Sequence, residues 1–127
     1  MIKQQAEDNL YQNESLKNFA ELISNINLLK NKNYGCPWQN KQTHETLIPY
    51  LIEESHEFID SIKNNDKENM KEELGDLLLQ IMLHSEITKE NNLFSIKDVI
   101  NSLNHKIKSR HPYIFKARKK VSIEEAE

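Results

Sequence analysis

The sequence of 127 residues has few of the residues that interrupt helices or cross-link chains. It contains two glycines, three prolines and one cysteine. Cys36 has no second cysteine to pair with, so the fold cannot depend on an internal disulfide. Few glycines and prolines leave few positions for the many tight turns of a β-sandwich or barrel. The composition therefore predicts a soluble all-α fold in a single domain with a modest apolar core.

A surplus of basic residues and long apolar runs are also absent. Lysine and arginine number 17 against 20 acidic residues, which gives a formal net charge of −3. Proteins that bind the phosphate backbone of nucleic acids carry a basic surface instead. No stretch has the length of apolar sequence that a transmembrane helix needs, and residues 1–10 lack the apolar segment of a signal peptide. We therefore expect a cytoplasmic protein whose partners include no nucleic acid and no membrane.

Apolar residues recur at three- and four-residue steps in four segments, which is typical of helices with one buried face. Residues 1–14 lack such a stripe and are expected to form a flexible N-terminal extension. The first helix is expected to begin near Ser15 and to stop within residues 31–38, where asparagine, glycine and proline cluster. The predicted domain covers residues 15–115, and residues 116–127 form a tail of mixed charge.

The second helix is expected to have Thr46 as its N-cap and to run to about Lys63. Pro49 would then lie in the first turn, where a missing backbone N–H removes no helical hydrogen bond. The apolar stripe of this helix consists of Ile48, Leu51, Ile52, Phe58, Ile59 and Ile62. This stripe is predicted to face the core.

The third helix is expected to open with a capping box of Asn65 and Glu68 and to continue to about Asn91. It carries two apolar stripes. The main stripe consists of Met70, Leu74, Leu77, Leu78, Ile81 and Met82, and the weaker stripe of Leu79, Leu83 and Ile87. Each apolar stripe needs a packing partner that covers it, and in a short chain the second partner can be another subunit. We therefore expect a homo-oligomer, either a homodimer or a homotetramer.

The last predicted helix opens with the capping pair Ser95 and Asp98 and ends at His111-Pro112. The apolar stripe of this helix is regular and consists of Ile96, Val99, Ile100, Leu103 and Ile107.

Two pairs of carboxylates have the same spacing on the second and third predicted helices. Glu54 and Glu57 are three residues apart, and so are Glu73 and Asp76. This spacing places the two members of each pair about 60° apart on one helix face. Two such pairs facing each other would form a cage of oxygen ligands, which suits Mg²⁺ or Mn²⁺ rather than zinc or copper. The alternative is two solvated acidic faces, since glutamate is common on helix surfaces.

Several motifs, in this order, make the chain resemble the MazG family of nucleoside triphosphate pyrophosphohydrolases from about Leu16 to Phe115. They are Gly35-Cys36-Pro37-Trp38, Gln42-Thr43-His44-Glu45-Thr46-Leu47, Leu51-Ile52-Glu53-Glu54 with Glu57, Glu72-Glu73-Leu74-Gly75-Asp76-Leu77-Leu78-Leu79-Gln80, and Arg110-His111-Pro112 with Phe115. The resemblance implies a bundle of four to five helices with a metal site between two antiparallel helices, completed by oligomerisation. The chain departs from the family pattern at Gln39, where the family usually has an aspartate. This difference is expected to alter the geometry of the loop or the selection of the base.

The resemblance also implies the ligands and the reaction. Magnesium, or manganese in its place, would be held by four residues, namely Glu54, Glu57, Glu73 and Asp76. Water would attack the α-phosphorus of a nucleoside triphosphate and release pyrophosphate and the monophosphate. Glu53, beside the first pair, is a candidate for the residue that orients or deprotonates this water, with an ordinary solvated glutamate as the alternative.

Five further residues are candidate contacts to the substrate. Lys106 and Arg110 are four residues apart on the last predicted helix and could present two cations to the polyphosphate. Trp38 could stack on the base, and Lys41 and His44 lie in the same loop. The alternatives are ordinary surface charge for the cations and a core position for Trp38.

The sequence therefore predicts a magnesium-dependent enzyme that controls or cleanses pools of nucleoside triphosphates. A catalytically silent module of the same fold, which senses nucleotides or assembles with a partner, is the alternative. Four intact carboxylates argue against it, because without a metal they would repel one another.

Overall fold

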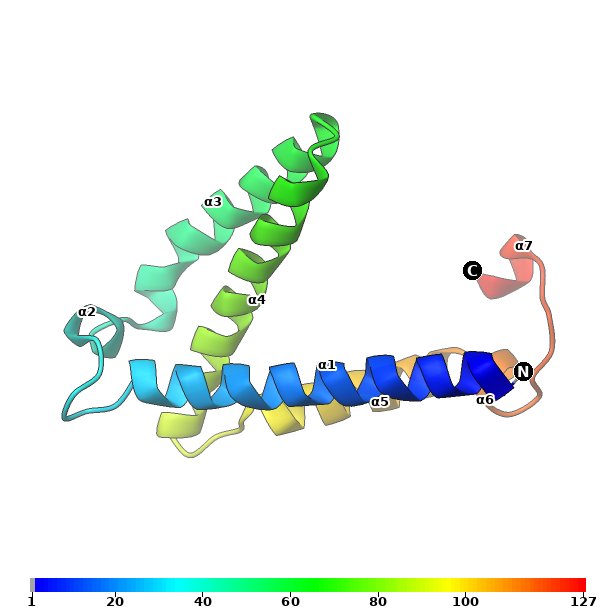
Figure 1. Ribbon diagram of the computed structural model, residues 1–127, viewed down its shortest axis with the longest axis horizontal. Coiled ribbons are helices and arrows are strands. Elements are labelled where there is room, and N and C mark those ends of the chain that lie inside the picture. The colour runs from blue at the N-terminus through cyan, green and yellow to red at the C-terminus, as the bar shows by residue number, and fades with distance from the viewer. Residues whose placement is uncertain (1) are drawn as a thin grey trace. The chain divides into compact units, whose positions relative to one another are not determined.

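All regular secondary structure that a computed structural model describes in residues 2–127 is helical, so the all-α prediction is confirmed. The long helices are α1 (Ile2–Leu29), α3 (His44–Lys63), α4 (Lys67–Glu90) and α5 (Ile96–Arg110) (Figure 1). The short ones are α2 (Pro37–Asn40), α6 (Pro112–Phe115) and α7 (Ile123–Ala126). Within the described range, no helix combines the length and the apolar character needed to cross a bilayer.

The chain divides into two compact units. The first ends at Ile87 and contains α1, α2, α3 and most of α4, whereas the second covers Thr88–Glu127 and contains α5, α6 and α7. The four candidate metal ligands belong to the first unit. Lys106 and Arg110 belong to the second.

The core of the first unit lies where α1, α3 and α4 meet. Leu47, near the start of α3, packs with Leu83 and Ile87 of α4, and the half-buried Leu29 and Leu79 pack against this cluster. Three of these five residues form the stripe of α4 that was predicted to be the weaker one. Within this chain, the weaker stripe is therefore the one that packs in this cluster, and of the main stripe only Met82 is fully buried among the described residues.

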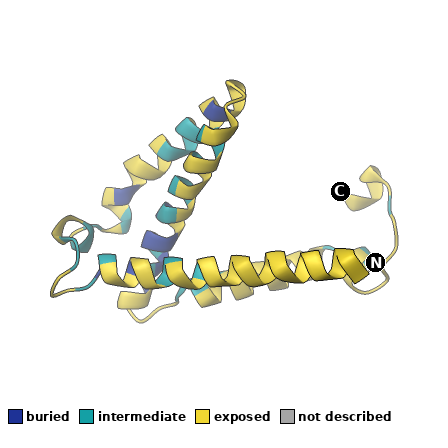
Figure 2. Cartoon of the chain, viewed as in Figure 1, coloured by how far each residue is buried: buried dark blue, intermediate teal, exposed yellow. Residues whose placement is uncertain are grey.

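The stripes predicted as the main core faces of α3 and α4 are largely exposed, so this part of the prediction was wrong. Leu74 exposes 50% of its surface and Ile81 47%, and on α3 Ile52 exposes 54%. Figure 2 accordingly colours much of the hairpin as exposed. The sides of α3 and α4 that face each other carry carboxylates and imidazoles, so the apolar residues lie on the outer sides of the hairpin. Periodicity locates an apolar stripe but does not say what covers it.

Helix α3 begins at His44, with Thr43 rather than Thr46 as its N-cap. The Thr46 backbone N–H donates to Thr43 Oγ1 at 3.2 Å, and the Thr43 backbone N–H donates to Thr46 Oγ1 at 2.8 Å. This reciprocal pair satisfies two backbone donors at once, which favours the earlier start. Pro49 consequently lies inside the helix and not in its first turn.

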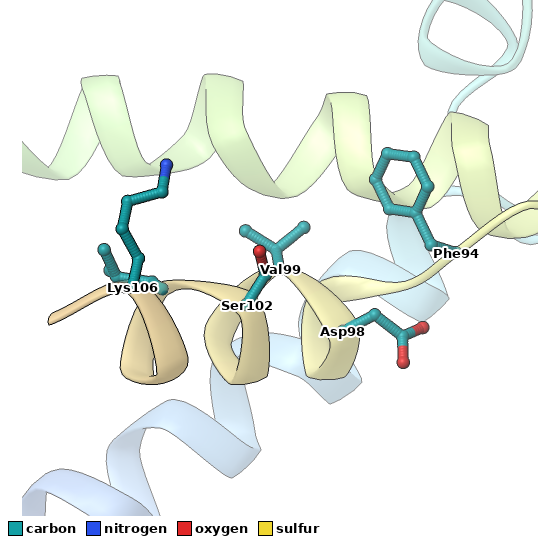
Figure 3. Close-up of a pocket in the computed structure, with 6 residues that line it drawn as sticks. Phe94, Asp98, Val99, Ser102 and Lys106 are labelled. Atoms are coloured by element: carbon teal, nitrogen blue, oxygen red, sulfur yellow. The ribbon is translucent and has the colours of Figure 1, made fainter. Parts of the chain in front are cut away.

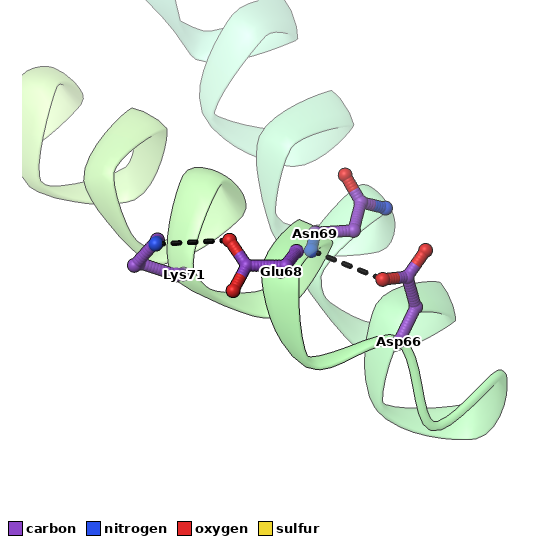
Figure 4. Close-up of polar contacts among 4 residues, drawn as sticks. All are labelled: Asp66, Glu68, Asn69 and Lys71. Atoms are coloured by element: carbon purple, nitrogen blue, oxygen red, sulfur yellow. Dashed lines mark hydrogen bonds and ion pairs between the residues drawn. The ribbon is translucent and has the colours of Figure 1, made fainter.

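Helix α4 is capped by Asp66 and not by Asn65, as Figure 4 shows. The Asn69 backbone N–H donates to Asp66 Oδ1 at 3.2 Å, while Asn65 has a φ of 51° and makes the turn from α3. Glu68, the predicted partner of Asn65, pairs with Lys71 at 2.9 Å. Both members of this ion pair are strongly exposed, so its contribution to stability is small.

The ends of α5 and the start of α1 can also be compared with the prediction. The predicted capping pair of α5 is confirmed, because the Ser95 backbone N–H donates to Asp98 Oδ2 at 3.0 Å, and α5 ends before His111-Pro112 as expected. Helix α1 begins at Ile2 rather than near Ser15. Its first half has no buried stripe, so periodicity gave no signal there, although glutamine, glutamate, alanine and leucine favour helix.

The loop after α1 folds back onto the end of that helix and so positions α2. The Gly35 backbone N–H donates to the Asn31 carbonyl at 2.9 Å, and the Cys36 N–H donates to the Leu29 carbonyl at 2.8 Å. A Cβ atom on Gly35 would lie 2.5 Å from the Asn31 oxygen and 2.6 Å from the Leu29 oxygen. These are backbone atoms of the helix end, so they cannot move aside cheaply. Only glycine fits this close approach.

We predict that Gly35→Ala lowers the free energy of unfolding by about 1–3 kcal/mol, the usual cost of overpacking. Gly75→Ala is the matched control, because a Cβ at Gly75 meets no atom within 4 Å. Gly75 lies within α4, so alanine there should raise stability by up to about 1 kcal/mol. Urea denaturation measures both changes, and equal effects of the two substitutions would contradict this account of the loop.

Candidate metal centre

The hairpin of α3 and α4 brings the two predicted carboxylate pairs together. Glu54 and Glu57 come from α3, and Glu73 and Asp76 from α4. One carboxylate oxygen of each lies within 4.8 Å of those of the other three, and all four residues are half-buried. We call these four residues the carboxylate cluster. The spacing seen in the sequence therefore does place the two pairs face to face.

Burial and mutual repulsion change the acidity of the cluster. Desolvation by burial, followed by the negative charges of Glu57 and Asp76, raises the pKa of Glu54 to about 7. The pKa of Glu73 is also raised, first by burial and then by its contact with Glu57. In metal-free protein the cluster therefore favours retention of a proton at neutral pH.

Two oxygens of the cluster have no hydrogen-bond partner. Glu54 Oε2 and Glu73 Oε2 are both buried and unpaired within the described residues. An unpaired buried acceptor is costly, and a cation bound between the two helices would satisfy both atoms. The all-oxygen donor set fits a hard divalent cation. Glu53 is exposed on α3 beside the cluster and is not one of the four converging carboxylates.

An imidazole pair joins the same two helices nearer the core. His44 is the first residue of α3 and His84 lies on α4, with 2.7 Å between their Nδ1 atoms and with stacked rings whose centroids are 5.0 Å apart. One Nδ1 must donate and the other accept. Burial, followed by the charge of His44, lowers the pKa of His84. His84 Nε2 is buried and has no hydrogen-bond partner in the part of the chain that the structure describes.

Trp38 lies on α2 with 46% of its surface exposed, which excludes the alternative of a core position. Its ring meets Tyr50 of α3 edge to face, with centroids 5.6 Å apart and planes at 90°. Tyr50 precedes Glu54 by four residues, so the aromatic pair lies one turn from the carboxylate cluster along α3. Sequence analysis missed Tyr50, because its contact with Trp38 depends on how α2 packs against α3. Lys41 is exposed at the end of α2.

Lys106 lines a cavity of about 560 Å³ in the second unit (Figure 3). The other lining residues are Phe94, Asp98, Val99, Ser102 and Leu103. Arg110 is the exposed last residue of α5. The predicted contact of these two cations with a triphosphate stays a prediction.

Comparison with known proteins identifies the family. The MazG nucleotide pyrophosphohydrolase domain matches residues 42–115. The nucleoside triphosphate pyrophosphohydrolase/pyrophosphatase MazG of Thermotoga maritima is 50% identical over 97 residues, which cover 76% of this chain and 38% of that protein. The nucleoside triphosphate pyrophosphohydrolase of Escherichia coli K12 is 34% identical over 94 residues, covering 74% of this chain and 36% of that protein.

A solved structure has the same fold. The crystal structure of a mazG-related protein from Thermotoga maritima matches with a TM-score of 0.69 and 32% identity, covering 87% of this chain and 90% of that one. The chain thus spans most of this structural relative but little more than a third of the two relatives matched by sequence. The domain match covers more than half of the chain and includes all four carboxylates. The chain therefore belongs to the MazG nucleotide pyrophosphohydrolase family.

Proposed function

We propose that this protein is a magnesium-dependent pyrophosphohydrolase that converts nucleoside or deoxynucleoside triphosphates to the monophosphate and pyrophosphate, and so controls or cleanses nucleotide pools. The observation that carries the proposal is the carboxylate cluster, with four converging carboxylates and two buried, unpaired oxygens. Membership of the family and the names of the relatives support the reaction. A silent nucleotide-sensing module is not favoured, because without a bound metal it would retain the repulsion among the four carboxylates.

In this proposal Glu54, Glu57, Glu73 and Asp76 hold Mg²⁺, or Mn²⁺ in its place. The chemistry that the ion supplies when bound is neutralisation of the triphosphate charge and a lower pKa of the attacking water. The exposed Glu53 is the residue that would orient or deprotonate that water.

The substrate contacts complete the proposal. Trp38 would stack on the base, and Lys41 and His44, which follow it closely in the chain, would contact the nucleotide. Lys106 and Arg110 of the second unit would bind phosphate oxygens. The exposure of Trp38 and its contact with Tyr50 support the stacking role, because the ring is both accessible and held in place.

We also propose a homodimer or homotetramer. The outer sides of α3 and α4 expose apolar residues that a monomer would leave in water. The exposed residues are Ile48, Ile52, Ile59, Leu74, Leu78 and Ile81. A second copy of the hairpin has the complementary apolar surface, and closed symmetry is the commonest way to cover it.

We predict that Glu54→Ala and Asp76→Ala abolish pyrophosphate release from a panel of NTPs and dNTPs, because each removes a ligand of the proposed ion. The assay measures pyrophosphate, orthophosphate and monophosphate with Mg²⁺ and with a chelator. Glu72→Ala is the matched control, since Glu72 is exposed on α4 beside the cluster. Circular dichroism should show unchanged helicity in all three variants. Full activity in both ligand variants would remove the metal assignment.

We predict that the pH dependence of stability reports Glu54. A pKa raised from 4.5 to about 7 in the folded protein gives stability that is present below pH 4.5 and is lost as the pH rises through about 7. In chelator, the melting temperature of Glu54→Gln relative to the wild type should therefore rise over this range. Comparing the two proteins cancels the opposite effect of His84, whose pKa is lowered. Parallel curves for the two proteins would refute the prediction.

We predict that nucleotide binding quenches the fluorescence of Trp38, the sole tryptophan of the chain. A non-hydrolysable nucleoside triphosphate should quench it, whereas inorganic tripolyphosphate, which has no base, should not. Stacking of a base on an aromatic ring is worth about 1–3 kcal/mol, so Trp38→Leu should raise KM by about 5- to 150-fold. Equal quenching by both ligands would argue against stacking.

A further inference from the structure

Gln80 is a buried polar side chain near the carboxylate cluster that the proposed mechanism leaves without a role. It exposes 6% of its surface, and its Oε1 has no hydrogen-bond partner within the described residues. A buried amide oxygen without a partner destabilises a folded protein. Glu54 Oε2 and Glu73 Oε2 share this property, and their proposed role is to bind a ligand. We therefore ask whether the Gln80 oxygen also binds a ligand.

Contacts on either side of Gln80 show which way it faces. Asp76, Gln80 and His84 follow one another at four-residue steps, so they lie in one row on α4. Asp76 meets α3 in the carboxylate cluster, and His84 meets α3 through His44. Gln80 therefore lies on the side of α4 that faces α3, between the cluster and the imidazole pair.

The pairing of the two antiparallel helices sets the level of Gln80 along the hairpin. His44 lies opposite His84, and Glu54 belongs with Asp76 in the cluster. Tyr50 lies one turn before Glu54, and Gln80 one turn after Asp76. Both are therefore displaced from the cluster in the same direction, toward α2. Tyr50 at this level carries the contact to Trp38.

One helical turn is about 5.4 Å, which is the scale of the step from an α-phosphate to the sugar and base of a nucleotide. We propose that Gln80 is a specificity-determining residue whose Oε1 accepts a hydrogen bond from the nucleoside part of the substrate. The donor is either a hydroxyl of the sugar or an N–H of the base. The inference rests on the proposed function, because the triphosphate has to be held at the carboxylate cluster.

The variant that tests this is Gln80→Met, which keeps the length and helix propensity of the side chain but loses the amide. Calorimetry with Mg²⁺ should show that Gln80→Met weakens binding of non-hydrolysable nucleoside triphosphates by about 2- to 10-fold, the effect of one neutral hydrogen bond. Binding of inorganic tripolyphosphate should be unchanged. The melting temperature of the free protein should rise, because a buried unpaired oxygen is removed. A purely structural glutamine would show no such combination.

Ser85→Ala is the matched control, because Ser85 is a buried polar residue of the same helix whose Oγ donates to the Ile81 carbonyl at 2.8 Å. It should leave nucleotide binding unchanged. A loss in Gln80→Met confined to ribonucleotides would identify the 2′-hydroxyl as the donor, and a loss that varies with the base would identify a base N–H. Unchanged nucleotide binding, or an equal loss for tripolyphosphate, would overturn the inference. Wild-type protein that binds the analogues but releases no pyrophosphate from NTPs would overturn only the proposed function.

Discussion

The repulsion among four carboxylates, held together by two helices, is the constraint on which this molecule depends. Glu54 and Glu57 of α3 meet Glu73 and Asp76 of α4, with one oxygen of each within 4.8 Å of those of the other three. Burial, followed by repulsion from Glu57 and Asp76, raises the pKa of Glu54. The cluster does not hold the hairpin together. Apolar packing of Leu47 against α4 closes one end of it, and the short turn at Asp66 closes the other. The carboxylates are thus kept close by contacts made elsewhere, which is how a site is prepared for a cation.

A polar interior of the hairpin has a consequence for its exterior. Because the facing sides of α3 and α4 carry carboxylates, Gln80 and two imidazoles, the apolar residues of both helices outside the Leu47 cluster lie largely on the outer sides. Ile52 and Leu74 are examples, each at least half exposed. A hairpin built in this way cannot form a complete core by itself. The proposed site and the expected assembly therefore have one origin, since polar residues on the inner sides of the hairpin leave apolar surface on the outer sides.

The sequence predicted those features that depend on spacing within one helix. The three-residue steps of the carboxylate pairs and the capping pair of Ser95 with Asp98 both survive in the structure. Sequence analysis did less well where two candidates compete locally, as at the start of α3, or where no stripe marks a helix, as in the first half of α1. Apart from the meeting of the two carboxylate pairs, it failed for contacts between different helices. The imidazole pair and the aromatic pair of Trp38 with Tyr50 depend on tertiary packing, which no local pattern encodes.

The order of groups along the hairpin indicates what the glutamine at position 39 affects. The resemblance to the family predicts an aspartate where this chain has Gln39. The Oε1 of Gln39 is buried without a partner within the described residues, while its backbone carbonyl accepts a hydrogen bond from Lys30 Nζ at 3.1 Å. The backbone contact does not depend on the side chain, so α2 keeps its place and Trp38 with it. The carboxylate cluster lies on other helices altogether. An amide in place of a carboxylate therefore changes the hydrogen bonding beside Trp38 and leaves the carboxylate cluster unchanged. In the proposed function this difference would affect selection of the nucleoside and not the chemistry at its phosphates.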